Sequence, residues 1–312
     1  MHFSDQNERN ISVDSIVIRD IRKQFGKKEV LKGISLMVPE GAACGLLGKN
    51  GAGKTTLNRI LTGLAFPTSG SAAICGETPG RGQIAYLSEN ISIFPGLTAY
   101  ENIEQMFLLD GMKPQRPFIL KLLDRIEIEN NKKKAGHFSL GMKRRLQIGM
   151  SMLTASRPVM ILDEPTNGLD INGVLWLKET IRKLKSEGTT MLITSHAIRE
   201  LEEDLTDYAI LYNGMIVAGG KTDDLDGGFL VTEFDAAETD KALPLLDQKG
   251  LNYIRNGNEL RIPCPTRTEE KEILSLLLAA GVTPRHYGMQ KNSLVDVFRA
   301  CTHGDEGEDS DA

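Results

Sequence analysis

Apolar and polar side chains alternate in several short stretches of the first two thirds of the chain. Residues 15–25 set Ile16, Ile18 and Ile21 against charged neighbours, as a half-buried strand does. Residues 159–162 are apolar at every position, which is typical of a strand covered on both faces of a parallel sheet. Other short stretches predict strands at 34–38, 42–47, 71–75, 83–87, 189–194, 208–212 and 215–218, the last two joined by an Asn-Gly turn.

Between several of these strands, apolar residues recur at three- and four-residue spacing and predict helices. The predicted helices cover residues 56–63, 98–128, 138–153 and 175–184, and Pro114 and Pro117 interrupt the second of them. Strands that alternate with helices predict a mostly parallel sheet with helices on both faces. The predicted fold class is therefore α/β.

The pattern changes near residues 223–228. Beyond this point we expect an extended segment at 229–234, a helix at 241–248, two short strands around an Asn-Gly turn at 256–257, and a helix at 269–280. This order predicts a small α+β accessory domain over residues 229–302. The polar leader, residues 1–14, and the acidic tail, residues 303–312, are expected to lack fixed structure.

Composition excludes several classes of protein. With 312 residues the chain is long enough for two domains, and its net charge of −5 does not favour nucleic acid or an anionic membrane surface. No apolar run approaches the roughly 18 to 20 residues that span a bilayer, and the polar N-terminus does not resemble a secretory signal. Four widely spaced cysteines are expected to be reduced thiols rather than disulfides or zinc ligands: Cys44, Cys75, Cys264 and Cys301.

The most specific motif is residues 48–55, Gly-Lys-Asn-Gly-Ala-Gly-Lys-Thr, which matches the phosphate-binding P-loop at every fixed position. It lies between a predicted strand and a predicted helix, as the motif requires. Its glycines allow the backbone N–H groups to point at one anion, and the helix N-terminus adds positive charge. Lys54 is expected to reach the β- and γ-phosphates and the Thr55 hydroxyl to bind Mg²⁺. The alternative, a glycine-rich turn with an incidental lysine, does not explain the full match.

Further polar residues follow other predicted strands. Asp163 and Glu164 end the apolar strand at 159–162, Asp170 follows in a Gly-Leu-Asp loop, and His196 comes directly after the strand at 189–194. Taken alone, the two acids also suit a helix N-terminus, and the histidine also suits a structural role. For Thr194 and Ser195 we expect no more than capping of the next helix.

These motifs occur in one order, and over residues 15–226 the chain resembles the nucleotide-binding subunit of an ATP-binding cassette (ABC) transporter. The resemblance implies a P-loop NTPase cassette with a RecA-like parallel sheet, an antiparallel β part and a helical subdomain at about 90–156. It implies that the chain is an ATPase with ATP and Mg²⁺ as cofactors.

The resemblance also implies roles for individual residues. Glu164 is the expected general base for the attacking water, and His196 the residue that contacts the γ-phosphate. Thr55, Glu89 and Asp163 are the expected Mg²⁺ site. The residues expected to bind nucleotide, with Phe25 stacked on adenine, are Phe25, Gly48, Asn50, Gly51, Gly53, Lys54, Thr55, Thr56, Ser139, Gly141 and Asp170.

Two positions depart from the common family pattern. The signature segment is Ser139-Leu140-Gly141-Met142, where Ser-Gly-Gly-Gln is most frequent, and Glu89 stands where a glutamine is expected. The glutamate adds a negative charge near Mg²⁺ and phosphate; the alternative is an exposed Glu89 outside the site. Both departures, with residues 293–298 near the C-terminus, resemble exporters that confer resistance to bacitracin, lantibiotics and other drugs.

The implied function is an ATPase that dimerises on ATP, with Ser139 and Gly141 facing the ATP of the opposite subunit. It would power a separate integral-membrane permease, which it would contact through Glu89 and the helices at 98–135. The chain would therefore lie on the cytoplasmic face of the cell membrane. The expected cargo is a peptide antibiotic or similar drug, and no nucleic acid is expected to bind.

The main alternative is a soluble ABC ATPase that acts on a non-membrane partner such as a ribosome or DNA. Translation-type members usually carry two cassettes, whereas this chain has one P-loop, and no extended heptad run predicts the coiled coil of chromosome-organising types. A regulator that senses ATP without efficient turnover is a third hypothesis. The intact Lys54, Asp163, Glu164 and His196 disfavour it.

Overall fold

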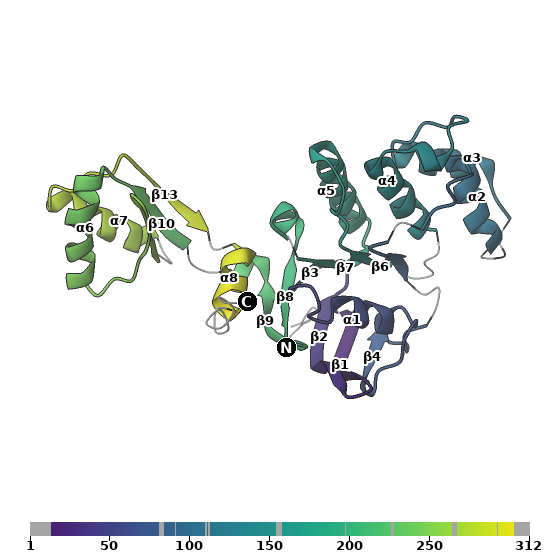
Figure 1. Cartoon of the computed structure of the whole chain (residues 1–312), viewed down its shortest axis with the longest axis horizontal. Coiled ribbons are helices and arrows are strands. Elements are labelled where there is room, and N and C mark those ends of the chain that lie inside the picture. Colours follow the sequence, from purple (N-terminus) through teal and green to yellow (C-terminus); the bar gives the residue numbers. More distant parts are fainter. Residues whose placement is uncertain are drawn as a thin grey trace, which may run out of the picture. The chain divides into compact units, whose positions relative to one another are not determined.

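The computed structural model describes residues 14–80, 84–90, 92–109, 111, 113–153, 158–196, 198–225, 228–263, 267–291 and 293–302. The chain divides into two compact units, Met1–Gly220 and Lys221–Ala312, which are described separately here (Figure 1). The predicted acidic tail and all of the predicted leader except Asp14 lie outside the described residues.

A six-stranded sheet forms the centre of the first unit. Its order is β5 (Ala85–Leu87), β6 (Val159–Asp163), β7 (Thr190–Ser195), β3 (Ala43–Leu47), β8 (Asp207–Tyr212) and β9 (Met215–Lys221). The first five strands pair in parallel. Every residue of β3, β6 and β7 is buried, which explains why these segments are apolar almost throughout.

An antiparallel sheet of three strands packs near this centre, in the order β2 (Lys28–Pro39), β1 (Asp14–Phe25) and β4 (Ser69–Ile74). In β1 the pairing register shifts between Ile18 and Ile21, with Asp20 at a φ of 46°. This bulge returns Ile21 to the buried face although it is three residues from Ile18, so all three isoleucines of the strand are buried.

Helices lie on both sides of the parallel sheet (Figure 1). Helix α1 (Lys54–Leu61) contacts β2, β4 and β6 and so packs between the two sheets, whereas α5 (Ile171–Ser186) lies on the opposite side. Leu57, Ile60 and Leu61 of α1 belong to the core that the two sheets share. Three short 3₁₀ turns follow: η2 (Ile198–Glu200), η3 (Glu202–Asp204) and η4 (Thr222–Asp224).

A helical part between β5 and β6 consists of α2 (Ala99–Leu109), α3 (Arg116–Arg125), the turn η1 (Ala135–His137) and α4 (Leu140–Ser151). These three helices pack against one another. The interruption predicted from the prolines is confirmed, because α2 ends at Leu109 and Pro117 occupies the first turn of α3.

The second unit contains a four-stranded antiparallel sheet in the order β11 (Ile254–Asn256), β12 (Glu259–Pro263), β10 (Gly228–Glu233) and β13 (His286–Lys291). Helices α6 (Ala236–Gln248) and α7 (Arg267–Ala279) connect its strands, and α8 (Leu294–Thr302) follows. The unit has its own apolar core, which includes Leu230, Phe234, Leu246, Leu260 and Leu277. Its β-α-β-β-α-β order extends the predicted one by β13.

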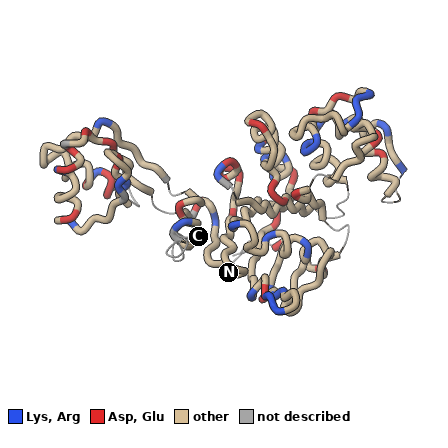
Figure 2. The backbone as a smooth tube through the Cα atoms, viewed as in Figure 1, with Lys and Arg blue, Asp and Glu red and all other residues tan. Residues whose placement is uncertain are grey.

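Charge is mixed along both units, with Lys and Arg interspersed among Asp and Glu (Figure 2). Among the described residues, no helix has the length and apolar character needed to cross a membrane. Cys44, Cys75 and Cys301 are free thiols, as expected, and Cys264 lies outside the described residues.

Leu192 tests the central sheet, because it is fully buried in β7. We expect Leu192→Ala to lower the free energy of unfolding of the first unit by about 2–5 kcal/mol, through lost apolar burial and a residual cavity. The matched control is Leu175→Ala on the exposed side of α5, with an expected change within about 0.5 kcal/mol. Denaturant unfolding of the full chain, followed by circular dichroism, measures both variants. An equal loss of unfolding free energy in the two variants would contradict the placement of Leu192 in the buried central sheet.

Candidate functional site

The P-loop connects β3 to α1 and bends back on itself at two glycines. Gly51 and Gly53 have φ angles of 82° and 115°, in the region that favours glycine. A Cβ on Gly53 would lie 2.6 Å from the side chain of Leu31. Gly53 is the N-cap of α1 and provides no side-chain bond to the helix, so the first N–H groups of α1 remain available to an anion.

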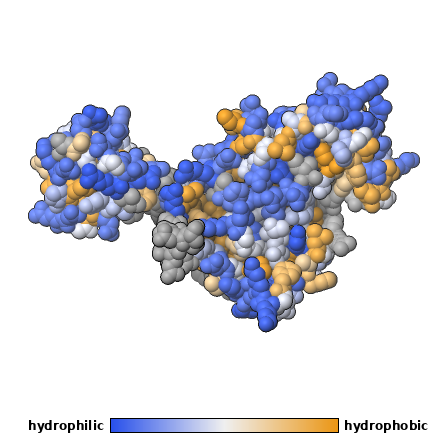
Figure 3. Space-filling view, in the orientation of Figure 1, coloured by the Kyte–Doolittle hydropathy of each residue, from blue (hydrophilic) through white to orange (hydrophobic). Residues whose placement is uncertain are grey.

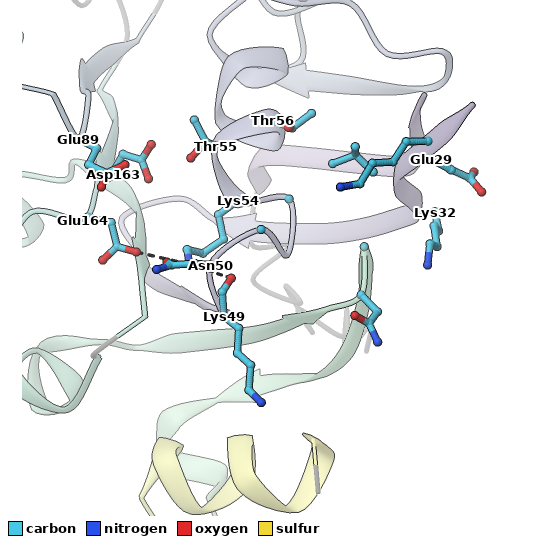
Figure 4. A pocket seen from close by; sticks show the side chains of 16 residues that line it. Glu29, Lys32, Lys49, Asn50, Lys54, Thr55, Thr56, Glu89, Asp163 and Glu164 are labelled. Atoms are coloured by element: carbon cyan, nitrogen blue, oxygen red, sulfur yellow. Dashed lines mark hydrogen bonds and ion pairs between the residues drawn. The ribbon is translucent and has the colours of Figure 1, made fainter. Parts of the chain in front are cut away.

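A cavity of about 600 Å³ opens in front of this loop (Figure 4). Strands β2 and β6, the P-loop, α1, the loop after β5 and the β8–β9 turn all contribute to its wall. The lining residues are Lys28, Glu29, Val30, Lys32, Lys49, Asn50, Gly51, Gly53, Lys54, Thr55, Thr56, Glu89, Asp163, Glu164, Asn213 and Gly214. Nine of the predicted site residues therefore line one cavity.

Lys54 is the buried cation of the cavity. Its Nζ donates a hydrogen bond to the carbonyl oxygen of Gly48 at 2.5 Å, and it lies 3.4 Å from a carboxylate oxygen of Glu164. Both side chains are almost fully buried, so the pair interacts with little screening by water. The ammonium group is thereby directed into the phosphate side of the cavity.

Glu164 occupies an unusual backbone conformation at the end of β6. Its φ of 48° is in the left-handed region, which residues other than glycine seldom adopt. The Glu164 N–H donates to the carbonyl of Thr194 at 2.9 Å. One carboxylate oxygen lies near Lys54, and the other is 2.8 Å from Nδ1 of His196, whose side chain is 43% exposed. Glu164 thus connects a buried cation to a histidine at the rim.

Asp163 is held by two hydroxyl donors. Thr194 donates to one carboxylate oxygen at 2.6 Å and Tyr86 to the other at 3.3 Å, while the Asn58 side-chain amide donates to the Thr194 hydroxyl at 3.2 Å. Burial, followed by the charge of Asp163, raises the pKa of Tyr86 above its usual value, so Tyr86 remains a donor. The capping role expected for Thr194 is wrong, since its hydroxyl orients Asp163 from within β7.

Thr55, Glu89 and Asp163 bring a hydroxyl and two carboxylates to one side of the cavity (Figure 4). Oxygen ligands of this kind fit Mg²⁺, which takes one or two carboxylates and completes its shell with phosphate and water. The described residues contain no group of three or more His, Cys, Asp or Glu side chains spaced to enclose a metal by themselves. Glu89 is exposed, as in the alternative interpretation, but it lines the cavity.

Several predicted site residues lie outside the lining. Phe25 is 54% exposed and pairs across the β1–β2 turn with Lys28, which does line the cavity. Ser139 caps α4 by accepting from the Met142 N–H at 3.2 Å. Asp170 caps α5 by accepting from the Gly173 N–H at 2.8 Å. Gly141, in the first turn of α4, is also outside this cavity.

Some residues of the site have no motif that marks them in the sequence. Asn213 and Gly214 form the turn between β8 and β9, and the Gly214 carbonyl accepts from the Lys32 N–H at 2.8 Å, which brings this turn to the cavity wall. In the sequence, the Asn-Gly pair predicts only the turn of a hairpin and does not indicate a binding site. Arg144 is buried between the loops that carry Glu89 and Glu164 and had only the pattern of a solvated helix.

Comparison with known proteins places this geometry in a family. A family model described as ABC transporter matches residues 31–167. The lantibiotic transport ATP-binding protein SrtF of Streptococcus pyogenes is 37% identical over 204 residues, which cover 64% of this chain and 88% of that protein. The chain belongs to the ABC transporter ATP-binding proteins.

Two further matches agree with this assignment. The bacitracin transport ATP-binding protein BcrA of Enterococcus faecalis is 32% identical over 241 residues, covering 74% of this chain and 78% of that protein. A solved structure of the ATP-binding subunit of an ABC transporter superposes with a TM-score of 0.60 and 28% identity, over 67% of this chain and 91% of that one. The expected cassette fold and the resemblance to the lantibiotic and bacitracin branch are confirmed, and this ABC protein is an ATPase that binds ATP.

Thr194 links Asp163 to α1 and provides a test of the site. We expect Thr194→Val, which keeps the shape but removes the hydroxyl, to lower the free energy of unfolding by about 1–3 kcal/mol, because it leaves buried Asp163 and Asn58 atoms without their partner. Thr194→Ser keeps the hydroxyl and is the control. Thermal or denaturant unfolding measures both, and a valine variant as stable as the serine variant would contradict the network.

Proposed function

We propose that this ABC ATPase hydrolyses ATP within a head-to-tail pair of chains and drives a separate membrane permease that exports a peptide antibiotic or similar drug. The observation that carries the catalytic part is the position of Glu164, inside the phosphate cavity and between Lys54 and His196. A carboxylate in that place is suited to accept a proton from water that attacks the γ-phosphate.

The residues of the cavity have different roles in ATP hydrolysis. The P-loop N–H groups, the α1 N-terminus and Lys54 bind the phosphates and balance their charge. Glu164 accepts the proton of the attacking water, and His196, which contacts Glu164, orients that carboxylate. Thr55, Asp163 and Glu89 would hold Mg²⁺, which neutralises charge on the phosphate oxygens when bound. Phe25 and the Asn213-Gly214 turn border the opposite end, where the base of the nucleotide fits.

A pair of chains accounts for the signature residues. Ser139 and Gly141 lie at the N-terminus of α4, which carries partial positive charge, but do not line the cavity of their own chain. The adjacent side chains of Leu140 and Ile171 are apolar and exposed. We infer that these surfaces face a second copy, where Ser139 and Gly141 contact its γ-phosphate and Asp170 lies in the loop between the two sites.

The helical part is the proposed contact with the permease. Figure 3 shows hydrophobic side chains at the surface of this part, and Leu108, Leu109 and Phe118 of α2 and α3 are exposed there. Exposed apolar groups of this kind mark surfaces that another protein covers. Such a contact would hold the chain at the cytoplasmic face of the membrane, and the names of the lantibiotic and bacitracin transport relatives support a peptide antibiotic as cargo.

Replacing the base separates ATP binding from turnover. We expect Glu164→Gln to lower kcat by about 10²–10⁴-fold, because the amide cannot accept the proton, while ATP still binds. Because the ATP is not hydrolysed, the paired chains should accumulate. Light scattering with and without ATP measures the fraction of paired chains. Hydrolysis at the normal rate would show that another group is the base, and a monomer with ATP would contradict the paired arrangement.

The export proposal needs a test in cells. A strain that lacks this chain should become more sensitive to one or more members of a panel of lantibiotics, bacitracin and anthracyclines. The wild-type chain should restore resistance and Glu164→Gln should not, because transport requires turnover. Co-purification of a protein with several membrane spans tests the permease. Unchanged sensitivity to the panel, with a non-membrane partner recovered instead, would favour the soluble ATPase alternative.

A further inference from the structure

Arg144 is a charged side chain enclosed near the start of α4. It is 2% exposed, although it belongs to a helix that begins at the surface. A guanidinium keeps its proton in proteins, so this charge needs compensation inside the molecule. Burial lowers the pKa of Arg144 below its usual value, and the negative charges of Glu89, Asp163 and Glu164 oppose that shift. Its direct partners include main-chain carbonyl oxygens of the loops that carry Glu89 and Glu164.

The guanidinium connects two loops that are distant in sequence. Nη1 donates to the carbonyl oxygens of Ser88 at 3.0 Å and Glu89 at 3.1 Å. Nη2 donates to the carbonyl oxygens of Glu164 at 3.1 Å and Asn167 at 3.5 Å. The planar fork of arginine allows one side chain to serve both loops, which the single ammonium of a lysine does not.

A second side chain of α4 supports the same arrangement. Gln147, one turn after Arg144, donates to the Asn90 carbonyl at 2.8 Å and to the Ser88 hydroxyl at 3.3 Å. Its side-chain oxygen lies 3.4 Å from Nη1 of Arg144. The buried face of the signature helix is therefore bonded to the main chain on both sides of Glu89.

The contact with Glu164 involves its strained peptide. A φ of 48° is disfavoured for a glutamate, so surrounding contacts must hold the residue in this conformation. Three bonds to its main chain do so: the Glu164 N–H donates to the Thr194 carbonyl, and the Glu164 carbonyl accepts from the Asn167 N–H at 3.2 Å and from Arg144. Since this conformation sets the direction of the Glu164 carboxylate, loss of the arginine would alter the position of the base.

We propose that Arg144 is a positioning residue for ATP hydrolysis, which holds the Glu89 and Glu164 loops in register, and that Glu89, whose main-chain carbonyl it contacts, supplies negative charge beside the buried guanidinium. The assignment rests on the function proposed above. It also gives the exposed glutamate at position 89 a physical reason: its carboxylate adds negative charge beside a buried cation, which is costly without compensation.

A double-mutant cycle in the full-length chain tests this pairing. We expect Arg144→Gln to lower kcat by about tenfold or more through misplacement of Glu164, with the KM for ATP changed less than about threefold, because Arg144 does not line the cavity. Glu89→Gln should also lower kcat. The relative kcat of each variant is its kcat divided by that of the wild type. The relative kcat of the double variant Glu89→Gln/Arg144→Gln should exceed the product of the relative kcat values of the two single variants by at least about fivefold, because removal of both charges restores the balance.

Arg145 provides the matched control. It is the next residue of α4, but it pairs with Glu127 and lies 4.9 Å from the ring centroid of Trp176, apart from both loops. The effects of Glu89→Gln and Arg145→Gln should multiply without coupling. Arg144→Lys, which keeps the charge and loses the fork, covers the case in which the glutamine variant does not fold; it should also lower kcat, at a melting temperature close to that of the wild type.

Two results would overturn the proposal. A wild-type kcat for Arg144→Gln or Arg144→Lys would show that the arginine does not position the base. Effects of Glu89→Gln and Arg144→Gln that simply multiply would show that the charges are not paired. Failure of the proposed function is seen separately: if Glu164→Gln hydrolysed ATP normally, the base would be wrong, while the coupling between positions 89 and 144 would still be measured.

Discussion

The site depends on one constraint, the convergence of charged groups at the carboxyl ends of parallel strands. β3 ends at the P-loop, β6 at Asp163 and Glu164, and β7 at His196, so adjacent strands deliver a cation, two anions and a histidine to one edge of the sheet. The strands themselves are wholly buried, which leaves this edge as the place where polar chemistry is tolerated. The positive end of α1 completes the edge and attracts the phosphates.

Within this edge, buried hydrogen bonds determine where each carboxylate points. Asp163 accepts from Thr194 and Tyr86, and Glu164 lies between Lys54 and His196. Buried polar groups are costly when unpaired and stiff when satisfied. The same physical rule therefore explains both the stability of the site and its precision. An enzyme that must place water in line with a phosphorus atom needs such stiffness in its base.

Much of this arrangement follows from local sequence. The apolar strands, the P-loop and the acids after β6 each have a pattern that is complete within a few residues, and they were predicted near their observed positions. Arg144 was not, because a basic residue on a helix usually faces solvent, and only the fold shows that this one is enclosed. Asn213 was recognised as a turn residue, but its approach to the cavity depends on contact with Lys32, which is far away in sequence. The sequence does not predict β13, because Gly288 and its polar neighbours have low strand propensity and no regular apolar alternation. Antiparallel pairing with β10 stabilises this strand instead.

The β8–β9 turn has a consequence for the chain as a whole. Gly214 belongs to the wall of the nucleotide cavity, and β9 begins at the next residue and ends at Lys221, the first residue of the second unit. The covalent path from nucleotide to the accessory unit is thus a single strand of seven residues, about 23 Å when extended. The residue that borders the nucleotide cavity and the residue at which the second unit begins therefore belong to one continuous, hydrogen-bonded stretch of chain.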